Sequence, residues 1–302
     1  MAISDCVSAV DSRGRELVEH GTRAFPIACY HDDLGQMEVP WHWHEEWEAV
    51  VIESGRALIA AGSEKYEMQS GEGFFVPSGV VHACWDVKDS GCRFHSLVFH
   101  PRLIGGSPDS VFHQQYVLPL MDAPGCESIH LRPDGTWQKT ALDAIEQAWQ
   151  LCAVGEDGYE MHVRNLLTQL AWTLKQHLPS AAGFADGKAL RDGERIKKML
   201  EFIDAHLGDS IAAQDVARSA SISESECLRC FHATIGTTPI QYLRRRRVQR
   251  AAQLLASTKE KTADIAAKCG FQDMSYFART FREMEGCTPT EYRIANRKRN
   301  GC

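Results

Sequence analysis

The C-terminal third of this chain contains an internal repeat, which restricts the fold more than any other feature of the sequence. Segments at an offset of 49 or 50 residues match one another: Asp215-Val216-Ala217 with Asp264-Ile265-Ala266, Phe231 with Phe281, and Gly236 to Tyr242 with Gly286 to Tyr292. Each copy predicts a short helix, a turn and a second helix that ends at a glycine. Two such copies indicate a tandem helix-turn-helix unit.

Capping residues and glycine stops set the expected bounds of both copies. The expected elements are, in order, an opening helix at 195–207, a first supporting helix at 211–219, its partner from Ser223 to Ile235, a linking helix at 240–256, a second supporting helix at 262–268 and its partner from Asp273 to Glu285. The second helix of such a motif commonly enters the major groove of DNA, so its exposed face carries the candidate base contacts.

Helical spacing puts Cys227, Phe231 and Phe281 on the buried faces of these two helices. The residues expected on the exposed faces, as candidate DNA contacts, are Ser225, Leu228, Arg229, His232, Met274, Ser275, Ala278, Arg279 and Arg282. Arg229 and Arg279 are equivalent, each lying two positions before the repeated Phe. An arginine on an exposed recognition face can bind O6 and N7 of a guanine, so these two are the principal candidates for base contacts.

The linking helix carries the densest positive charge of the chain, Arg244 to Arg247 with Arg250. Within it, Arg245 and Arg246 are predicted to contact DNA phosphates. A helix of this length spans about 25 Å, enough to hold two recognition helices roughly one turn of DNA, about 34 Å, apart. The alternatives are a solvated helix face, or salt bridges from some of these arginines inside the domain.

Charge is divided unevenly along the chain. Residues from Arg191 onward carry 20 Lys+Arg against 14 Asp+Glu, a net +6, whereas the whole chain carries −7, so residues 1–190 carry −13. Only the C-terminal part can therefore attract a polyanion. The eleven scattered cysteines fit reduced thiols, no apolar run approaches the roughly 20 residues that cross a bilayer, and the first residues lack a secretory signal. We expect a cytoplasmic protein without membrane contact.

The first 100 residues contain short apolar runs separated by Gly, Ser, Asp or Pro, which indicate an all-β sandwich or barrel. Among them lie His42, His44, Glu48 and His82. Side chains alternate along a strand, so the first three can point to one side, while Trp47 points away. Together the four suit a divalent transition metal such as Zn, Ni, Fe or Mn. The alternative is a set of hydrogen-bonded polar groups that holds no metal.

These residues belong to a longer pattern, His42-x-His44-x3-Glu48-x6-Gly55 followed by Gly71-x5-Pro77-x-Gly79-x2-His82. The pattern resembles the two sequence motifs of the cupin superfamily. Cupins are double-stranded β-helical jelly rolls, so the resemblance implies that the four candidate ligands project into a barrel.

Helical spacing appears after residue 135. Two apolar stripes, at 137–152 and 159–178, predict an antiparallel helical hairpin, and the breadth of the second favours a homodimer in addition to burial within the chain. The expected fold is α+β and multidomain. Its parts are a cupin-like sensor barrel at 1–135, the hairpin at 136–178, a linker at 179–190 and the tandem helix-turn-helix domain at 191–302.

Residues 191–293 resemble the DNA-binding domain of AraC/XylS-type transcription regulators. The residues that carry the resemblance are Ala217, Phe231, Gly236, Pro239, Tyr242, Ala266, Gly270-Phe271, Ser275-Tyr276-Phe277, Arg279, Phe281, Gly286, Thr288-Pro289 and Tyr292. With the cupin-like barrel, it implies a bacterial regulator that binds double-stranded DNA, senses a small-molecule effector or metal, and activates or represses a promoter. RNA polymerase is a candidate partner, and no catalysis is expected.

Two alternatives stay open. The barrel could be a metal-dependent enzyme, since cupins with this ligand set include dioxygenases and isomerases, although a catalytic barrel gains little from a tandem DNA-binding domain. It could also be a vestigial barrel that serves only as a dimerisation platform.

Overall fold

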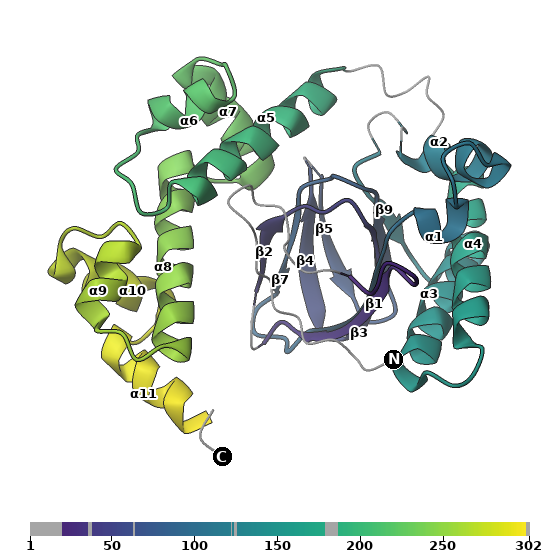
Figure 1. Cartoon of the computed structure of the whole chain (residues 1–302), viewed down its shortest axis with the longest axis horizontal. Helices are drawn as coiled ribbons and strands as arrows, with labels where there is room; N and C mark the ends of the chain where they lie inside the picture. Colours follow the sequence, from purple (N-terminus) through teal and green to yellow (C-terminus); the bar gives the residue numbers. More distant parts are fainter. Residues whose placement is uncertain are drawn as a thin grey trace. The chain divides into compact units, whose positions relative to one another are not determined.

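The computed structural model describes residues 20–35, 38–62, 64–121, 123, 126–178 and 187–299 of the 302-residue chain (Figure 1). The chain divides into two compact units, the first ending at Glu194 and the second beginning at Arg195. Of the predicted linker at 179–190, residues 179–186 lie outside the described part of the chain. None of the described helices is both long and apolar enough to span a membrane.

The first unit is built on two antiparallel sheets that face each other (Figure 1). One sheet has the strand order β1-β8-β3-β6-β9 and the other β2-β7-β4-β5. The strands are β1 (Ile27–Asp33), β2 (Val39–His42), β3 (Trp47–Ser54), β4 (Arg56–Ala61), β5 (Glu64–Gln69), β6 (Gly73–Val76), β7 (His82–Asp86), β8 (Arg93–Phe99) and β9 (Ile129–Leu131). The predicted fold class, α+β with an N-terminal cupin-like barrel, is confirmed.

Strand β3 contributes alternate side chains to two hydrophobic cores. Val50 and Ile52 are buried inside the barrel, whereas Trp47 belongs to a second core shared with the helices that cover the outer face of the sheet. The Trp47 ring contacts Phe75 and Phe99, with ring centroids 5.3 and 5.9 Å away. The expectation that Trp47 faces away from the barrel interior is confirmed.

The predicted helical hairpin consists of α3 (Thr136–Val154) and α4 (Tyr159–Gln176), and α3 contacts β1, β3, β8 and β9 (Figure 1). Three short elements precede it: α1 (Arg102–Gly105), a π-helix η1 (His113–Val117) and α2 (Leu118–Met121). Close approach of the hairpin to the sheet requires a glycine at position 73. A Cβ on Gly73 would lie 2.3 Å from the carbonyl oxygen of Val50 and 2.7 Å from Cδ2 of Leu142.

The second unit is helical. Its elements are the part of α5 (Gly187–Ala205) from Arg195 onward, α6 (Ala213–Ser219), α7 (Glu224–Ile235), α8 (Pro239–Ser257), α9 (Thr262–Lys268), α10 (Met274–Glu285) and α11 (Pro289–Arg299). The predicted caps are confirmed, because Ser223 and Asp273 accept backbone N–H bonds at the starts of α7 and α10. Gly236 and Gly286 end these helices with left-handed φ values of 81° and 71°. Helix α5 begins at Gly187 and not at the predicted 195.

The repeat is visible in the packing as well as in the sequence. Phe231 of α7 packs edge-on against Tyr242 of α8, with ring centroids 5.6 Å apart, and Phe281 of α10 packs in the same way against Tyr292 of α11 at 5.5 Å. Helix α8 contacts α6 of the first copy and α9 and α10 of the second. It is therefore the element to which both copies are attached.

Candidate functional site

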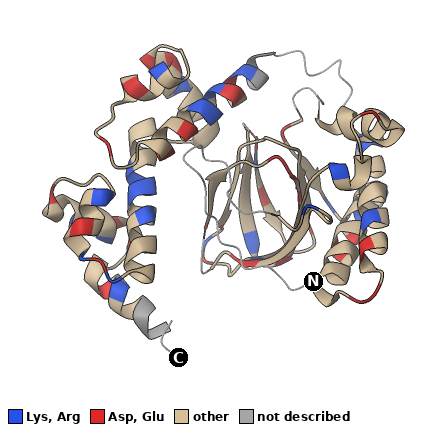
Figure 2. Ribbon diagram, in the orientation of Figure 1, with Lys and Arg blue, Asp and Glu red and all other residues tan. Residues whose placement is uncertain are grey.

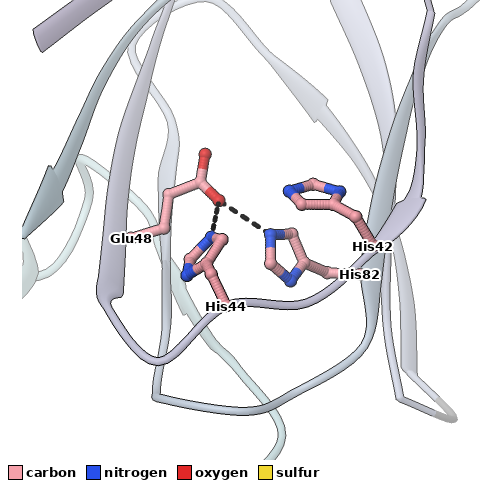
Figure 3. Close-up of side chains that lie close together, drawn as sticks. All are labelled: His42, His44, Glu48 and His82. Carbon is pink, nitrogen blue, oxygen red and sulfur yellow. Dashed lines mark hydrogen bonds and ion pairs between the residues drawn. The ribbon is translucent and has the colours of Figure 1, made fainter. Parts of the chain in front are cut away.

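The four predicted metal ligands lie together inside the barrel (Figure 3). His42 ends β2, His44 follows it in the turn toward β3, Glu48 lies on β3 and His82 begins β7. His42 and His82 face each other across the β2–β7 pair, because they are register partners there. The structure brings together the four side chains that the pattern selected, although the chain bends between His44 and β3; metal binding by them stays a prediction.

The donor atoms of this cluster are close enough to share one ion. All four lie within 4.8 Å of one another. Oε2 of Glu48 is 2.8 Å from Nε2 of His82 and 3.5 Å from Nε2 of His44, as the dashed lines in Figure 3 mark. The three imidazoles are buried, with 5%, 2% and 4% of His42, His44 and His82 exposed.

Each imidazole is held by a backbone carbonyl through its other nitrogen. The Nδ1 atoms of His42, His44 and His82 lie 2.9, 3.0 and 2.8 Å from the carbonyl oxygens of Pro40, Glu46 and Val80 respectively. A carbonyl only accepts, so each Nδ1 must carry the proton and donate it. In the neutral rings Nε2 is then a lone pair, which is the arrangement found around protein-bound metals.

The three Nε2 atoms and the Glu48 carboxylate converge on one small volume, so a cation placed among them would contact all four groups. Nε2 of His44 is buried, and the nearest carboxylate oxygen, Oε2 of Glu48, lies 3.5 Å away. Burial disfavours the charged form of Glu48, but hydrogen bonds and charges from His44 and His82 outweigh it and hold the pKa of this carboxyl well below its usual range. The residues present therefore fit a divalent metal ion, with His42, His44, Glu48 and His82 as its ligands.

The cavity around these ligands is small, about 40 Å³. Its wall also includes His20, Tyr30, Asp32 and Ser96, which the sequence analysis did not identify. His20 is buried, accepts or donates a 2.8 Å hydrogen bond at the Tyr30 hydroxyl, and packs edge-on against the ring of His44 at 5.6 Å. The even numbering of Tyr30, Asp32 and Ser96 within their strands was a usable signal, whereas His20 precedes the first strand and gave none.

The predicted DNA-binding faces of α7 and α10 are largely exposed. Of the nine candidates, Ala278 is half-buried, and the exposed ones are Ser225, Leu228, Arg229, His232, Met274, Ser275, Arg279 and Arg282. Arg229 is engaged within its own helix, since its Nε and a terminal nitrogen donate to the two Glu226 oxygens at 2.9 and 2.7 Å. The guanidinium of Arg279 lies 6.0 Å from the Tyr276 ring centroid. DNA contact by these residues stays a prediction.

The structure corrects the role assigned to Arg246. Figure 2 shows the basic segments of α8, which contains no acidic residue, but Arg246 does not face solvent. Only 11% of its side chain is exposed, and Nε donates at 3.0 Å to Oδ1 of Asp204 on α5, which is 3% exposed. Helical geometry turns this side chain toward α5, so Arg246 is an internal ion-pair partner and not a phosphate contact. Arg245, beside it, is exposed and stays a candidate.

Arg247, the next residue of the run, also makes hydrogen bonds inside the unit. Its Nε donates at 2.7 Å to the carbonyl of Leu207, and its two terminal nitrogens donate to the carbonyls of Gly270 and Asp209. Gly270 has φ +78°, and a Cβ there would lie 2.7 Å from the Arg247 guanidinium carbon. One arginine thus joins the end of the opening helix to the turn of the second copy.

Comparisons with known proteins agree with both halves of this description. The AraC-like ligand binding domain family matches residues 25–171, and a helix-turn-helix domain family matches residues 216–295. YdeC, an uncharacterized HTH-type transcriptional regulator of Bacillus subtilis (strain 168), is 29% identical over 293 residues, 95% of this chain and 98% of that protein. The HTH-type transcriptional activator RhaR of Yersinia pestis is 26% identical over 258 residues, 83% of each.

Among solved structures, an apo ToxT variant from Vibrio cholerae aligns over 92% of this chain and 99% of that chain, with 12% identity and a TM-score of 0.47. The matched families and curated relatives are regulators and give no support to the enzyme alternative. With a ligand-binding barrel followed by a tandem helix-turn-helix unit, the chain belongs to the AraC family of DNA-binding transcriptional regulators.

Proposed function

We propose that this regulator takes its signal from a divalent transition metal held in the barrel by His42, His44, Glu48 and His82. The observation that carries the proposal is the fixed orientation of the three imidazoles, each with Nδ1 on a carbonyl and Nε2 toward Glu48. Zn, Ni, Fe and Mn are all compatible with two or more imidazoles and a carboxylate. A bound metal would supply a positive charge that these four ligands require, and a coordination position for a small anion or water.

The size of the cavity supports an ion over a larger effector. Pockets for drug-sized or cofactor-sized molecules usually measure roughly 300–1,000 Å³, whereas this cavity measures about 40 Å³. The cavity therefore favours an ion with a small ligand over a larger effector.

A homodimer is the second part of the proposal. Large apolar side chains lie exposed on the hairpin, with 68% of Val154, 62% of Met161 and 47% of Trp172 accessible. Burial of such side chains at about 25 cal/mol per Å² favours association. RNA polymerase stays a predicted partner.

One experiment on the full chain tests metal and dimer together. Native mass spectrometry of the purified protein should give a dimer with one metal ion in each subunit. Stripping that metal with a chelator should change the affinity for the promoter site by about 5- to 150-fold, the usual range of coupling between two sites, and reloading should restore it. A monomeric mass would contradict the proposed dimer, and an unchanged promoter affinity would contradict the metal as the signal.

Arg229 and Arg279 are proposed to contact bases from α7 and α10. Replacing either with alanine should weaken binding to the cognate site by about 1–3 kcal/mol and relax the base preference there, while binding to random DNA changes little. Competition binding against a library of single-base variants would measure both effects. The matched control is Arg218→Ala, on the supporting helix, whose side chain is 69% exposed. An equal loss on random DNA would make these arginines phosphate contacts.

A further inference from the structure

We propose a second metal site on the outer wall of the barrel, formed by His31, Glu53 and His95, for a divalent ion such as Zn²⁺ or Co²⁺. These three residues offer donor atoms that all lie within 4.8 Å of one another. They share no residue with the interior cluster, and the proposal does not depend on DNA binding or on occupancy of the barrel cavity.

The sheet itself brings the three side chains together. His31 of β1 and His95 of β8 are direct register partners, so their side chains lie on the same face. Glu53 sits on β3 where the register with β8 shifts, and it has the same parity as Val51, the partner of His95. Neighbours of opposite parity, such as Ser96, line the interior cavity instead. The outer cluster therefore lies on the opposite face of this sheet from the interior cavity.

The side chain of His95 is held in the orientation that a metal ligand needs. Its Nδ1 lies 2.9 Å from a carboxylate oxygen of Glu146 on α3, and its ring stacks on Trp149 with centroids 3.5 Å apart and planes 10° from parallel. Donation from Nδ1 to Glu146 leaves Nε2 as a lone pair for an ion. A carboxylate that orients a metal-binding histidine in this way is a recurrent feature of zinc sites.

The other two donors are already close to each other. Nε2 of His31 is 3.0 Å from Oε2 of Glu53, and tetrahedral ligands of zinc at their usual bond lengths lie about 3.3 Å apart. The His31 and Glu53 side chains are 34% and 39% exposed, against 12% for His95. An ion can therefore enter from solvent, keep water as its remaining ligand, and exchange more easily than one inside the barrel.

An ion at this position would connect three strands to the helical hairpin. His31, Glu53 and His95 come from β1, β3 and β8, and Glu146 fixes the site to α3. Binding to the folded state alone stabilises that state in proportion to the logarithm of ion concentration. We expect added Zn²⁺ to raise the unfolding temperature of the first unit through this outer cluster.

The test uses the full chain with Glu48→Gln, which weakens the interior site, and compares it with the same chain carrying His31→Gln or Glu53→Gln in addition. Co²⁺ binding is followed by equilibrium dialysis and by visible absorption. We expect each added substitution to lower Co²⁺ affinity at least tenfold, and Glu146→Gln to lower it about 10- to 100-fold. Zn²⁺ should raise the melting temperature of the Glu48→Gln chain, and should not raise that of the same chain carrying His31→Gln in addition.

His162→Gln is the matched control, since His162 is an exposed histidine on α4 outside both clusters. Its Co²⁺ affinity should equal that of the parent. Equal affinities for the His31→Gln and His162→Gln chains would overturn the outer site, because Co²⁺ would then be bound elsewhere. All the cluster substitutions are at partly exposed positions, so each variant is expected to fold.

Discussion

Replacing Arg246 with alanine is expected to destabilise the second unit by about 3–5 kcal/mol, because it removes the guanidinium that pairs with the buried carboxylate of Asp204. The Asp204 side chain is 3% exposed and accepts two hydrogen bonds from the Arg246 guanidinium, at 3.0 and 3.4 Å. Since domains are stable by only roughly 5–15 kcal/mol, the loss would remove much of the stability of this unit. DNA binding should fail through unfolding and not through a lost phosphate contact.

The positions of the tryptophans allow the loss of stability to be assigned to one unit. All seven tryptophans precede residue 195, so tryptophan fluorescence reports unfolding of the first unit only. In urea, the Arg246→Ala chain should lose helical circular dichroism at lower denaturant than the parent, while its fluorescence transition stays in place. A shift of the fluorescence transition instead would mean that the damage lies in the barrel.

Two further variants distinguish the loss of the buried ion pair from the loss of a surface charge. Arg245→Ala, at the exposed neighbouring position, should change stability by no more than about 0.5 kcal/mol and should reduce the salt dependence of DNA binding. The double change Arg246→Met with Asp204→Leu should recover most of the stability, since apolar residues can replace a buried pair. If Arg246→Ala left stability intact and only reduced the salt dependence, the original phosphate assignment would be right.

The helices of the second unit could be predicted closely because the residues that begin and end them are close to them in the sequence. Ser223 and Asp273 supply side-chain caps, and Gly236 and Gly286 supply the left-handed stops. These signals act within four residues, so a single sequence contains them. The beginning of helix α5 at Gly187 was not predicted.

The orientation of the arginine run could not be predicted, because its partners are distant in sequence. Asp204 is 42 residues from Arg246, and Arg247 is bound by backbone carbonyls of Leu207 and Gly270, which carry no residue-type signal. The interior cluster likewise combines side chains that could be predicted with backbone contacts that could not. The residue pattern of the strands predicted which four side chains lie together, but the carbonyls that orient the imidazoles are backbone atoms.

Replacing His82 with alanine is expected to abolish tightly held metal, from one ion to fewer than about 0.1 per chain after dialysis. His82 supplies one of the three oriented Nε2 atoms and is the ligand nearest to Glu48, at 2.8 Å. Loss of a group that only orients a ligand costs about 10- to 100-fold in affinity, so loss of a ligand should cost more. Elemental analysis of dialysed protein measures the effect.

Glu48→Gln provides an independent check, since it keeps the shape of the side chain and removes only the charge that balances the ion. It should weaken metal retention while the barrel stays folded, as tryptophan fluorescence would report. His162→Ala, on the surface of α4, should leave the metal content unchanged. Metal retained at the parental level by the His82→Ala chain would place it elsewhere, with the buried cysteines as the next donors to examine. The four buried groups would then have to be balanced by protons, and the barrel would need another signal.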